Sequence, residues 1–297
     1  MAATMREAFG RTASTIVDED PDAAVVLAEI STEYFGECAA RHPDRVINVG
    51  IMEQTMVGVA AGLAMGGFRP IAHSIAPFVA ERPYEQLKLD IGYQGLGGTF
   101  VGTGGSYDYA AEGATHHAPA DATLMLAIPG MQVLAPGHPD EVAALLRAVH
   151  GGAAPSYMRL NASTNGSAHV GAPGEMRVLR SGASDLVVLA FGPMLDRVAD
   201  TVARLDATLL YTAALRPFDA STLAAAVPDG ASVVCIEPWY VGTATPVVAE
   251  ALGGRRVALS SIGVPRAFIH RYGSAADLDA DLGLDEAGIR AQLERLT

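Results

Sequence analysis

The chain has 297 residues, with 20 Lys and Arg against 33 Asp and Glu, which gives a formal net charge of −13 at pH 7. This acidic balance argues against nucleic acid or an anionic membrane surface as the main partner, because both attract basic patches. Half of the residues are hydrophobic and only 18% are charged, so the chain can bury a large core, which argues against wholesale disorder.

The two cysteines, Cys38 and Cys235, are too few for a disulfide framework or a cysteine-based metal site, and both are predicted to be buried thiols. The least polar stretch, residues 122–139, is interrupted by Pro and Gly and is therefore not a membrane span. Residues 5–16 repeat apolar side chains at helical spacing and lack the features of a signal peptide. We therefore expect a cytoplasmic protein.

The first half of the chain alternates short apolar runs with helical patterns. The strands expected there are Ala24–Ala28, Val46–Val49, Pro70–Ser74, Thr99–Gly102, Met131–Ala135 and Ser156–Arg159. The helices expected there are Gln54–Met65, Pro83–Gly92, Pro119–Ala127 and Pro139–Val149. Three of these helices begin with proline, which is favoured at the first helical position. This alternation predicts a mostly parallel sheet with helices on both faces.

Residues 161–175, rich in Gly, Ala, Ser and Asn, separate this pattern from a second one of the same kind. The second pattern predicts strands Leu186–Phe191, Thr208–Tyr211, Ser232–Ile236 and Val257–Ser260, and helices Pro193–Leu205, Thr245–Leu252 and Glu286–Leu296. We therefore predict an α/β fold of two doubly wound domains, residues 1–165 and 183–297, joined by a linker over 166–182.

Glu53 is the first candidate for chemistry, because it follows a predicted strand and precedes an apolar helix without any charge. One interpretation is a first-turn carboxylate that interacts favourably with the helix dipole. The other is a carboxyl group in an apolar site, where desolvation raises the pKa and allows the group to share a proton. The helix N-terminus opposes that rise, so the residues alone leave both interpretations open.

A glycine-rich loop over 102–117 follows another strand and ends in His116 and His117. Loops at the carboxyl ends of parallel strands are where such folds bind ligands. The loop is not a dinucleotide fingerprint, since Tyr107 stands at the last glycine position, and it lacks the lysine of a phosphate-binding P-loop. Adjacent histidines point apart and make a poor metal pair without a third ligand. We expect one exposed histidine and one in a ligand site.

Arg159, at the end of the last strand of the first domain, is the third candidate. Its planar guanidinium group could bind a carboxylate or a phosphate. It could equally tie the two domains together, and the residues alone favour neither interpretation.

Taken in order, these stretches resemble the transketolase family of thiamine diphosphate enzymes. The matching segments are Asn48–Gln54 with Ala61–Ala64, Glu112–His116 with Leu126–Met131, and Tyr157–Leu160. The resemblance covers nearly the whole chain and corresponds to the pyrimidine-binding domain plus the C-terminal domain, the second half of a full transketolase. Each segment alone is a weak signal, whereas the ordered set is specific.

The resemblance implies that Glu53 contacts the aminopyrimidine ring and stabilises the imino tautomer that takes the proton from thiazolium C2. The cofactor then serves as electron sink while a two-carbon ketol unit passes from a ketose donor to an aldehyde acceptor. Phe78 falls where the family stacks an aromatic ring on the pyrimidine, although plain core packing remains an alternative. Met52 and Ile75 fall beside the cofactor, and His116 matches a histidine that acts in proton transfer near the reacting carbonyl.

Four further positions would bind substrate by the same resemblance. Arg159 matches an arginine that grips the substrate phosphate, whereas Gly104, Glu112 and His117 replace the usual histidine, aspartate and glutamine of the family. Glu81 also stands where some members have an aromatic residue. Such exchanges redirect specificity strongly, so we expect a non-standard donor or acceptor, with residues 107–109 as replacement contacts.

The family holds the diphosphate and its divalent metal with a Gly-Asp-Gly segment, and this sequence contains none. The resemblance therefore implies the C-terminal subunit of a split transketolase. That subunit would share thiamine diphosphate with a separately encoded N-terminal subunit, which would hold Mg²⁺ or another divalent metal, and no metal ligands are expected in this chain. We expect an α2β2 heterotetramer that is inactive without the partner.

Three alternative functions are compatible with parts of the pattern. The β subunit of a 2-oxoacid dehydrogenase has the same layout, but the segments 115–116 and 127–131 favour transketolase. A noncatalytic partner subunit has no need of Glu53. A nicotinamide oxidoreductase needs phosphate-cradling glycines after a strand, and the second domain has only Gly192-Pro193 there. The segment 265–273, with Arg266, His270 and Arg271, is predicted to be a surface or interface segment without a chemical role.

Overall fold

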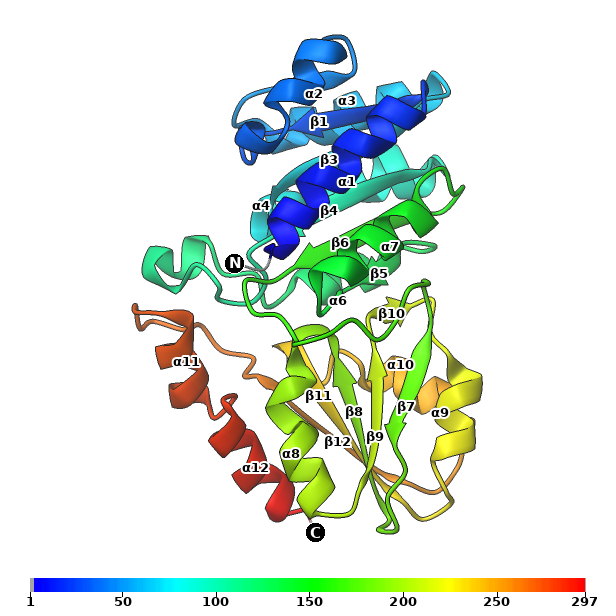
Figure 1. Ribbon diagram of the computed structural model, residues 1–297, viewed down its shortest axis with the longest axis vertical. Helices are drawn as coiled ribbons and strands as arrows, with labels where there is room; N and C mark the ends of the chain where they lie inside the picture. Colours follow the sequence, from blue (N-terminus) through cyan, green and yellow to red (C-terminus); the bar gives the residue numbers. More distant parts are fainter. Residues whose placement is uncertain (1–2, 297) are drawn as a thin grey trace.

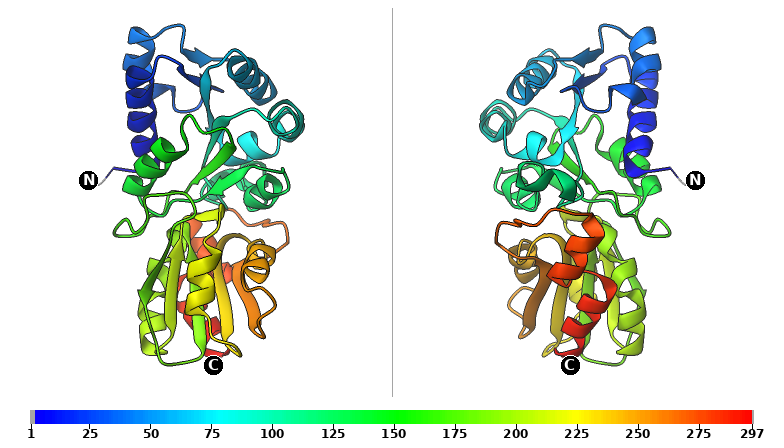
Figure 2. Two further views of the ribbon diagram at one scale, coloured as in Figure 1. Left: turned by 90° about the vertical axis from the view of Figure 1, so that its right-hand side faces the viewer. Right: turned by 90° about the vertical axis from the view of Figure 1, so that its left-hand side faces the viewer.

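The computed structural model describes residues 3–296 and has two α/β domains placed end to end, each around its own sheet (Figures 1 and 2). The first sheet has seven strands in the order β10-β5-β6-β4-β3-β1-β2, and the second has five in the order β12-β11-β8-β9-β7. All pairs are parallel except those of β10 with β5 and β7 with β9. The predicted α/β fold class with parallel-dominated sheets is confirmed.

The first domain places helices on both faces of its sheet. Its strands are β1 (Ala23–Leu27), β2 (Val46–Asn48), β3 (Arg69–Ile75), β4 (Gly98–Thr103), β5 (Gln132–Leu134) and β6 (Pro155–Leu160). Its helices are α1 (Met5–Glu19), η1 (Thr32–Tyr34), α2 (Gly36–Arg41), α3 (Glu53–Met65), α4 (Ala76–Ala80), α5 (Tyr84–Gln86), η2 (Leu87–Tyr93), η3 (Ala110–Thr115), α6 (Asp121–Leu126) and α7 (Pro139–Val149). β1, β4 and β6 are almost wholly buried, as strands of a doubly covered parallel sheet should be.

Two predicted helices differ from the structure. The expected helix Pro83–Gly92 is one short turn, α5, followed by the π-helical segment η2. The helix expected from Pro119 begins only at Asp121, and the Pro119 carbonyl instead accepts a hydrogen bond from the Tyr240 backbone N–H of the second domain. Both differences arise from tertiary contacts or local geometry that apolar spacing does not encode.

The second domain repeats the layered arrangement. Its strands are β7 (Met176–Arg180), β8 (Leu186–Phe191), β9 (Thr208–Thr212), β10 (Ala214–Arg216), β11 (Ser232–Tyr240) and β12 (Ala258–Val264). Its helices are η4 (Gly192–Met194), α8 (Asp196–Arg204), α9 (Ala220–Ala226), α10 (Thr245–Ala251), α11 (Ala275–Leu282) and α12 (Glu286–Glu294). In Figure 1, α8, α11 and α12 lie on one side of the sheet and α9 and α10 on the other.

Two strands were not expected from the sequence. β7 lies inside the predicted linker 166–182 and forms the edge of the second sheet, antiparallel to β9. β10 leaves the second domain and extends the first sheet, antiparallel to β5. β10 is only three residues long, and β7 buries only Met176 fully, so neither has an apolar pattern of its own. Residues 176–180 therefore belong to the second sheet and not to a free connection.

The core follows the two faces of the sheets. One apolar cluster joins α1 and α7 to one face of the first sheet and continues beneath α8 and α12. The other joins α3 and α6 to the opposite face and continues beneath α9 and α10. Cys38 and Cys235 are buried free thiols within these clusters, as predicted. Between residues 3 and 296, no helix combines the length and apolar character that crossing a bilayer requires.

Candidate functional site

Three strands of the first sheet end at the same edge, and the segments after them carry the candidate side chains. Glu53 follows β2, Phe78 follows β3, and His116 follows β4. The three strands are parallel and are joined through β1, so their carboxyl ends bring these segments together. This edge is where ligands bind in open parallel sheets.

Glu53 is the first residue of α3 and is only 6% exposed. Its carboxylate is paired with one side chain, Arg82, whose Nη1 lies 3.0 Å from Glu53 Oε1. Arg82 is itself 47% exposed, so this ion pair is accessible to solvent on the arginine side. A buried carboxylate with a single half-exposed partner can exchange that partner for a ligand, because an ion pair that is open to solvent on one side contributes little stability.

Phe78 and His116 lie beside this ion pair. The Arg82 guanidinium carbon lies 3.5 Å from the centre of the Phe78 ring, which is cation–π stacking. The His116 ring meets Phe78 edge-on, with 5.1 Å between ring centres, and its Nδ1 lies 3.0 Å from the Thr115 hydroxyl. The structure therefore brings Glu53, Phe78 and His116 close together, through contacts with Arg82 and with one another.

The surface around Glu53 is hollowed and partly apolar. A depression of about 370 Å³ is lined by Met52, Glu53 and Arg82 together with Ile51, Gln54 and Thr55. Met52 is 56% exposed there, whereas Ile75 is buried at the end of β3 and precedes α4. The Glu53 carboxylate could meet the edge of a flat polar ring in this depression, whereas Phe78 is 8% exposed, is stacked on by Arg82 and does not itself line the depression.

Arg159 is not part of this group. It is 1% exposed, and its Nε, Nη1 and Nη2 donate to Asp121, the Pro238 carbonyl and the Ser106 hydroxyl, at 2.8, 2.9 and 2.9 Å. Asp121 is fully buried as well and also accepts from the Tyr157 hydroxyl. Arg159 thus ties the two domains together, and a substrate phosphate would have to break these bonds to reach it.

Gly104 has a left-handed backbone with a φ of +76°, and a Cβ there would collide with the ring of Tyr109. No larger side chain fits beside the Tyr109 ring, which also lies edge-on to His116. Glu112 is exposed on η3. Of the residues 107–109 expected as replacement contacts, Tyr109 therefore stands close to the site.

Tyr107 and Asp108, in contrast, contact the rest of the chain instead of the site. The Tyr107 hydroxyl donates to Asp279 in the second domain at 2.7 Å. Asp108 accepts from the Ala162 N–H at 2.8 Å, and its burial raises its pKa to about 6. Both residues strengthen the contact of the first domain with the segments that follow it.

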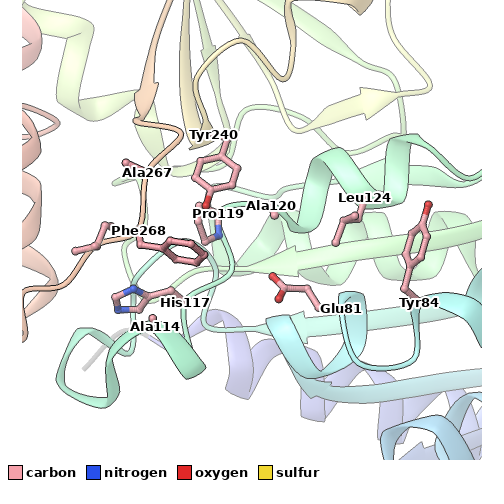
Figure 3. A pocket seen from close by; sticks show the side chains of 11 residues that line it. Glu81, Tyr84, Ala114, His117, Pro119, Ala120, Leu124, Tyr240, Ala267 and Phe268 are labelled. Atoms are coloured by element: carbon pink, nitrogen blue, oxygen red, sulfur yellow. The ribbon is translucent and has the colours of Figure 1, made fainter.

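His117 is 7% exposed, and its Nε2 is buried without a partner among the described residues. It lines a cavity of about 410 Å³ between the domains, which Glu81, Tyr240 and Phe268 also line (Figure 3). Burial lowers the pKa of His117, and burial together with Asp121 raises the pKa of Glu81 to about 7. His116 and His117 thus face different spaces, as adjacent histidines should.

Sequence reasoning missed Arg82. The signal available is its proximity in sequence to Phe78, since Arg82 lies in the turn that follows α4. The segment 265–273, predicted to be a surface or interface segment, is largely exposed and contacts the first domain, where Tyr272 packs against Gly113 of η3. Among the described residues, no three His, Cys, Asp or Glu side chains gather as a metal site requires.

Known proteins are similar to this chain in sequence and in fold. The family described as "Transketolase, pyrimidine binding domain" matches residues 1–165. An uncharacterized 33.6 kDa protein in the fasciation locus of Rhodococcoides fascians is 42% identical over 95% of this chain and 91% of its own length. An apulose-4-phosphate transketolase subunit of Actinobacillus succinogenes is 30% identical over 77% of this chain and 76% of its own length.

Among solved structures, a split gene transketolase described as an inactive β4 tetramer is similar over 99% of this chain and 98% of its own. Its TM-score is 0.83 and its sequence identity is 26%. The similarity therefore extends through both domains and is not confined to the pyrimidine-binding one.

Proposed function

Because the chain belongs to the transketolase family, as the C-terminal subunit of a split enzyme, we propose that it transfers a ketol unit together with a partner. The two-carbon unit passes from a ketose donor to an aldehyde acceptor, and the second polypeptide completes the site. One observation carries this proposal: the buried Glu53 carboxylate has a single replaceable partner and stands beside the face of Phe78.

Thiamine diphosphate is the cofactor that the family implies, and it supplies an electron sink for breaking a carbon–carbon bond. In this chain, Glu53 would hold the edge of its pyrimidine ring and Phe78 the face, with Met52 and Ile75 beside them. Arg82 now covers both positions, so it would turn toward solvent when the ring is bound.

His116 is suited to move protons near the reacting carbonyl. Its ring touches the Phe78 edge, and the Thr115 hydroxyl contacts its Nδ1, which fixes the ring orientation and leaves Nε2 for a substrate oxygen. A positioned imidazole of this kind contributes about 10²–10⁴-fold to rate.

The diphosphate and a divalent metal would be held by the partner, since this sequence has no Gly-Asp-Gly segment. The relative named as a transketolase subunit and the structural neighbour named "split gene" support a separately encoded companion. That neighbour is described as inactive, which supports an active α2β2 assembly over activity of this chain alone.

Reconstitution tests the proposal. The purified chain, its candidate N-terminal partner and their mixture are assayed with thiamine diphosphate, Mg²⁺, a ketose donor and an aldehyde acceptor. We expect carbon–carbon bond formation only in the mixture, with loss of activity in Glu53→Gln. Turnover by this chain alone, or none by a verified complex, would overturn the proposal.

A further inference from the structure

The interdomain cavity is lined by residues that are direct sequence neighbours of residues in the proposed reaction site. Glu81 is next in sequence to Arg82, and His117 is next to His116, yet both line the cavity of about 410 Å³. Figure 3 shows the side chains of Glu81, His117, Tyr240 and Phe268 around this space. The segments that carry Arg82 and His116 therefore also form part of the cavity wall, through their neighbours Glu81 and His117.

The walls of the cavity are mainly apolar and aromatic. Tyr84 and Leu124 form one side, and Tyr240, Phe268 and Ile269 of the second domain form the other. No lysine or arginine of the described chain lines it, and the arginine expected to hold a phosphate, Arg159, has its donors engaged elsewhere. A dianionic phosphate would thus find no counter-charge on the walls that this chain provides, which is unfavourable.

His117 points to a ligand rather than to a structural role. Its Nε2 is buried without a partner among the described residues, and buried polar groups are otherwise almost always hydrogen-bonded. Because burial lowers the pKa of His117, its imidazole is neutral and can exchange one hydrogen bond with a hydroxyl or carbonyl group. Burial raises the pKa of Glu81 to about 7, so its protonated form, populated in part near neutral pH, offers a second uncharged contact.

We propose that this cavity receives the acceptor aldehyde, and that the acceptor is an uncharged compound with an aromatic or otherwise apolar body rather than a sugar phosphate. The proposal rests on the proposed function and names its acceptor class. His117 makes the polar contact, and Phe268 covers the body of the acceptor from the second domain.

The high solvent exposure of Phe268 supports the assignment of this cavity to the acceptor. It is 79% exposed although it lines the cavity, so one ring face remains available for a ligand to stack on. Its loop is held in place from both ends, because Arg266 lies over the Tyr240 ring and Tyr272 packs on Gly113. The loop that the sequence left without a role therefore forms one wall of the cavity.

The test uses the assembled complex with hydroxypyruvate as donor and two probe acceptors, benzaldehyde and glyceraldehyde 3-phosphate. Hydroxypyruvate loses CO₂, its two-carbon unit forms one new carbon–carbon bond to the aldehyde carbon, and the aldehyde oxygen takes up one proton. No oxidant or reductant is needed. We expect kcat/KM for benzaldehyde to exceed that for glyceraldehyde 3-phosphate by at least about tenfold.

Two variants test whether residues of the cavity determine the preference between the two acceptors. Phe268→Ala removes an exposed ring and should lower kcat/KM for benzaldehyde by about tenfold, with donor-only CO₂ release unchanged. Ala267→Arg adds a cation at the rim and should raise kcat/KM for glyceraldehyde 3-phosphate. Tyr93→Ala is the matched control, since Tyr93 is an aromatic residue that is 83% exposed and lies outside this cavity.

The outcomes separate the two proposals. Absence of donor-only CO₂ release from the verified complex overturns the proposed function. CO₂ release with a preference for the phosphorylated acceptor, or with no effect of Phe268→Ala on benzaldehyde, overturns the acceptor assignment alone.

Discussion

Glu53 and Glu237 are both buried glutamates, one in each domain, yet their surroundings differ completely. Glu237 is fully buried and accepts three hydrogen bonds, from Trp239 Nε1 and from the N–H groups of Gly242 and Ala244. Glu53 has one partner, which is half exposed. A carboxylate whose acceptor capacity is filled by its own chain is structural, whereas one with a replaceable partner can serve a ligand.

Arg159 and Arg82 differ in the same way, in the number of their partners and in their own burial. Arg159 donates to three different groups and is buried, whereas Arg82 is held by one carboxylate and one ring. Both are reasonable anion binders by residue type alone. The number of their partners and the burial of the arginines themselves support the inference that Arg159 maintains the domain contact and that Arg82 can leave its place.

The largest expected effect is on catalysis. Glu53→Gln should lower ketol transfer by the assembled enzyme by about 10²–10⁴-fold, because the amide cannot share a proton with the cofactor. Its thermal unfolding should stay close to that of the parent, since only one partly exposed ion pair is lost. If Glu53→Gln kept most of the activity, Glu53 would be a structural carboxylate like Glu237 and not a catalytic one.

Arg159→Met should cost about 3–5 kcal/mol in the free energy of unfolding, because the buried Asp121 carboxylate is left without its counter-charge. Urea denaturation measures this loss, and adding Asp121→Asn should recover part of it. If Arg159→Met instead raised KM selectively for phosphorylated substrates without loss of stability, Arg159 would be a substrate-binding residue after all.

Glu237→Gln should cost about 1–3 kcal/mol of stability relative to the parent, because the amide nitrogen faces N–H groups that it cannot accept from. Ketol transfer by the folded complex should be unchanged. Comparing the denaturation midpoint and the specific activity of this variant with those of Glu53→Gln gives a direct measure of the contrast. If Glu237→Gln lost activity but kept its stability, Glu237 would not be a structural carboxylate.

A buried histidine, His73, is expected to make the stability of the protein depend on pH. Its ring is buried and contacts the Ser31 hydroxyl at Nε2 and the Val101 carbonyl at Nδ1, and burial lowers its pKa to about 3. The unfolded chain takes up this proton near pH 6.5. Stability should therefore fall below pH 6.5 by up to about 1.4 kcal/mol per pH unit. Denaturation at about pH 7 and about pH 5.5 tests this, with the exposed His270→Asn as a control that keeps the slope.

The smallest expected effect concerns Arg82. Arg82→Met should lower the thiamine diphosphate concentration for half-maximal activity by about two- to fivefold, because a competing contact with Glu53 is removed. Arg147→Met is the matched control, since Arg147 is also 47% exposed and pairs with Glu19 at 2.7 Å. Weaker cofactor binding in Arg82→Met would show that Arg82 holds the cofactor instead of covering its place.

The sequence predicted most of the fold, because apolar runs bounded by Gly and Pro reveal buried strands and because α7 has clear amphipathic spacing. Ordered motifs also identified Glu53, Phe78 and His116. The partners of Arg159 could not be predicted, since Asp121 and Pro238 lie 38 and 79 residues away. Arg82 likewise has nothing in its neighbouring residues to distinguish it from a solvated charge, because its partner Glu53 lies 29 residues away.

β10 has a consequence for how the enzyme can open. The second domain supplies the outermost strand of the first sheet, so rocking one domain against the other would break main-chain hydrogen bonds. Substrate entry and product escape must then depend on side chains, surface loops and the proposed companion polypeptide. The chain is therefore expected to move as one stiff body, and any large opening motion belongs to its junction with that companion.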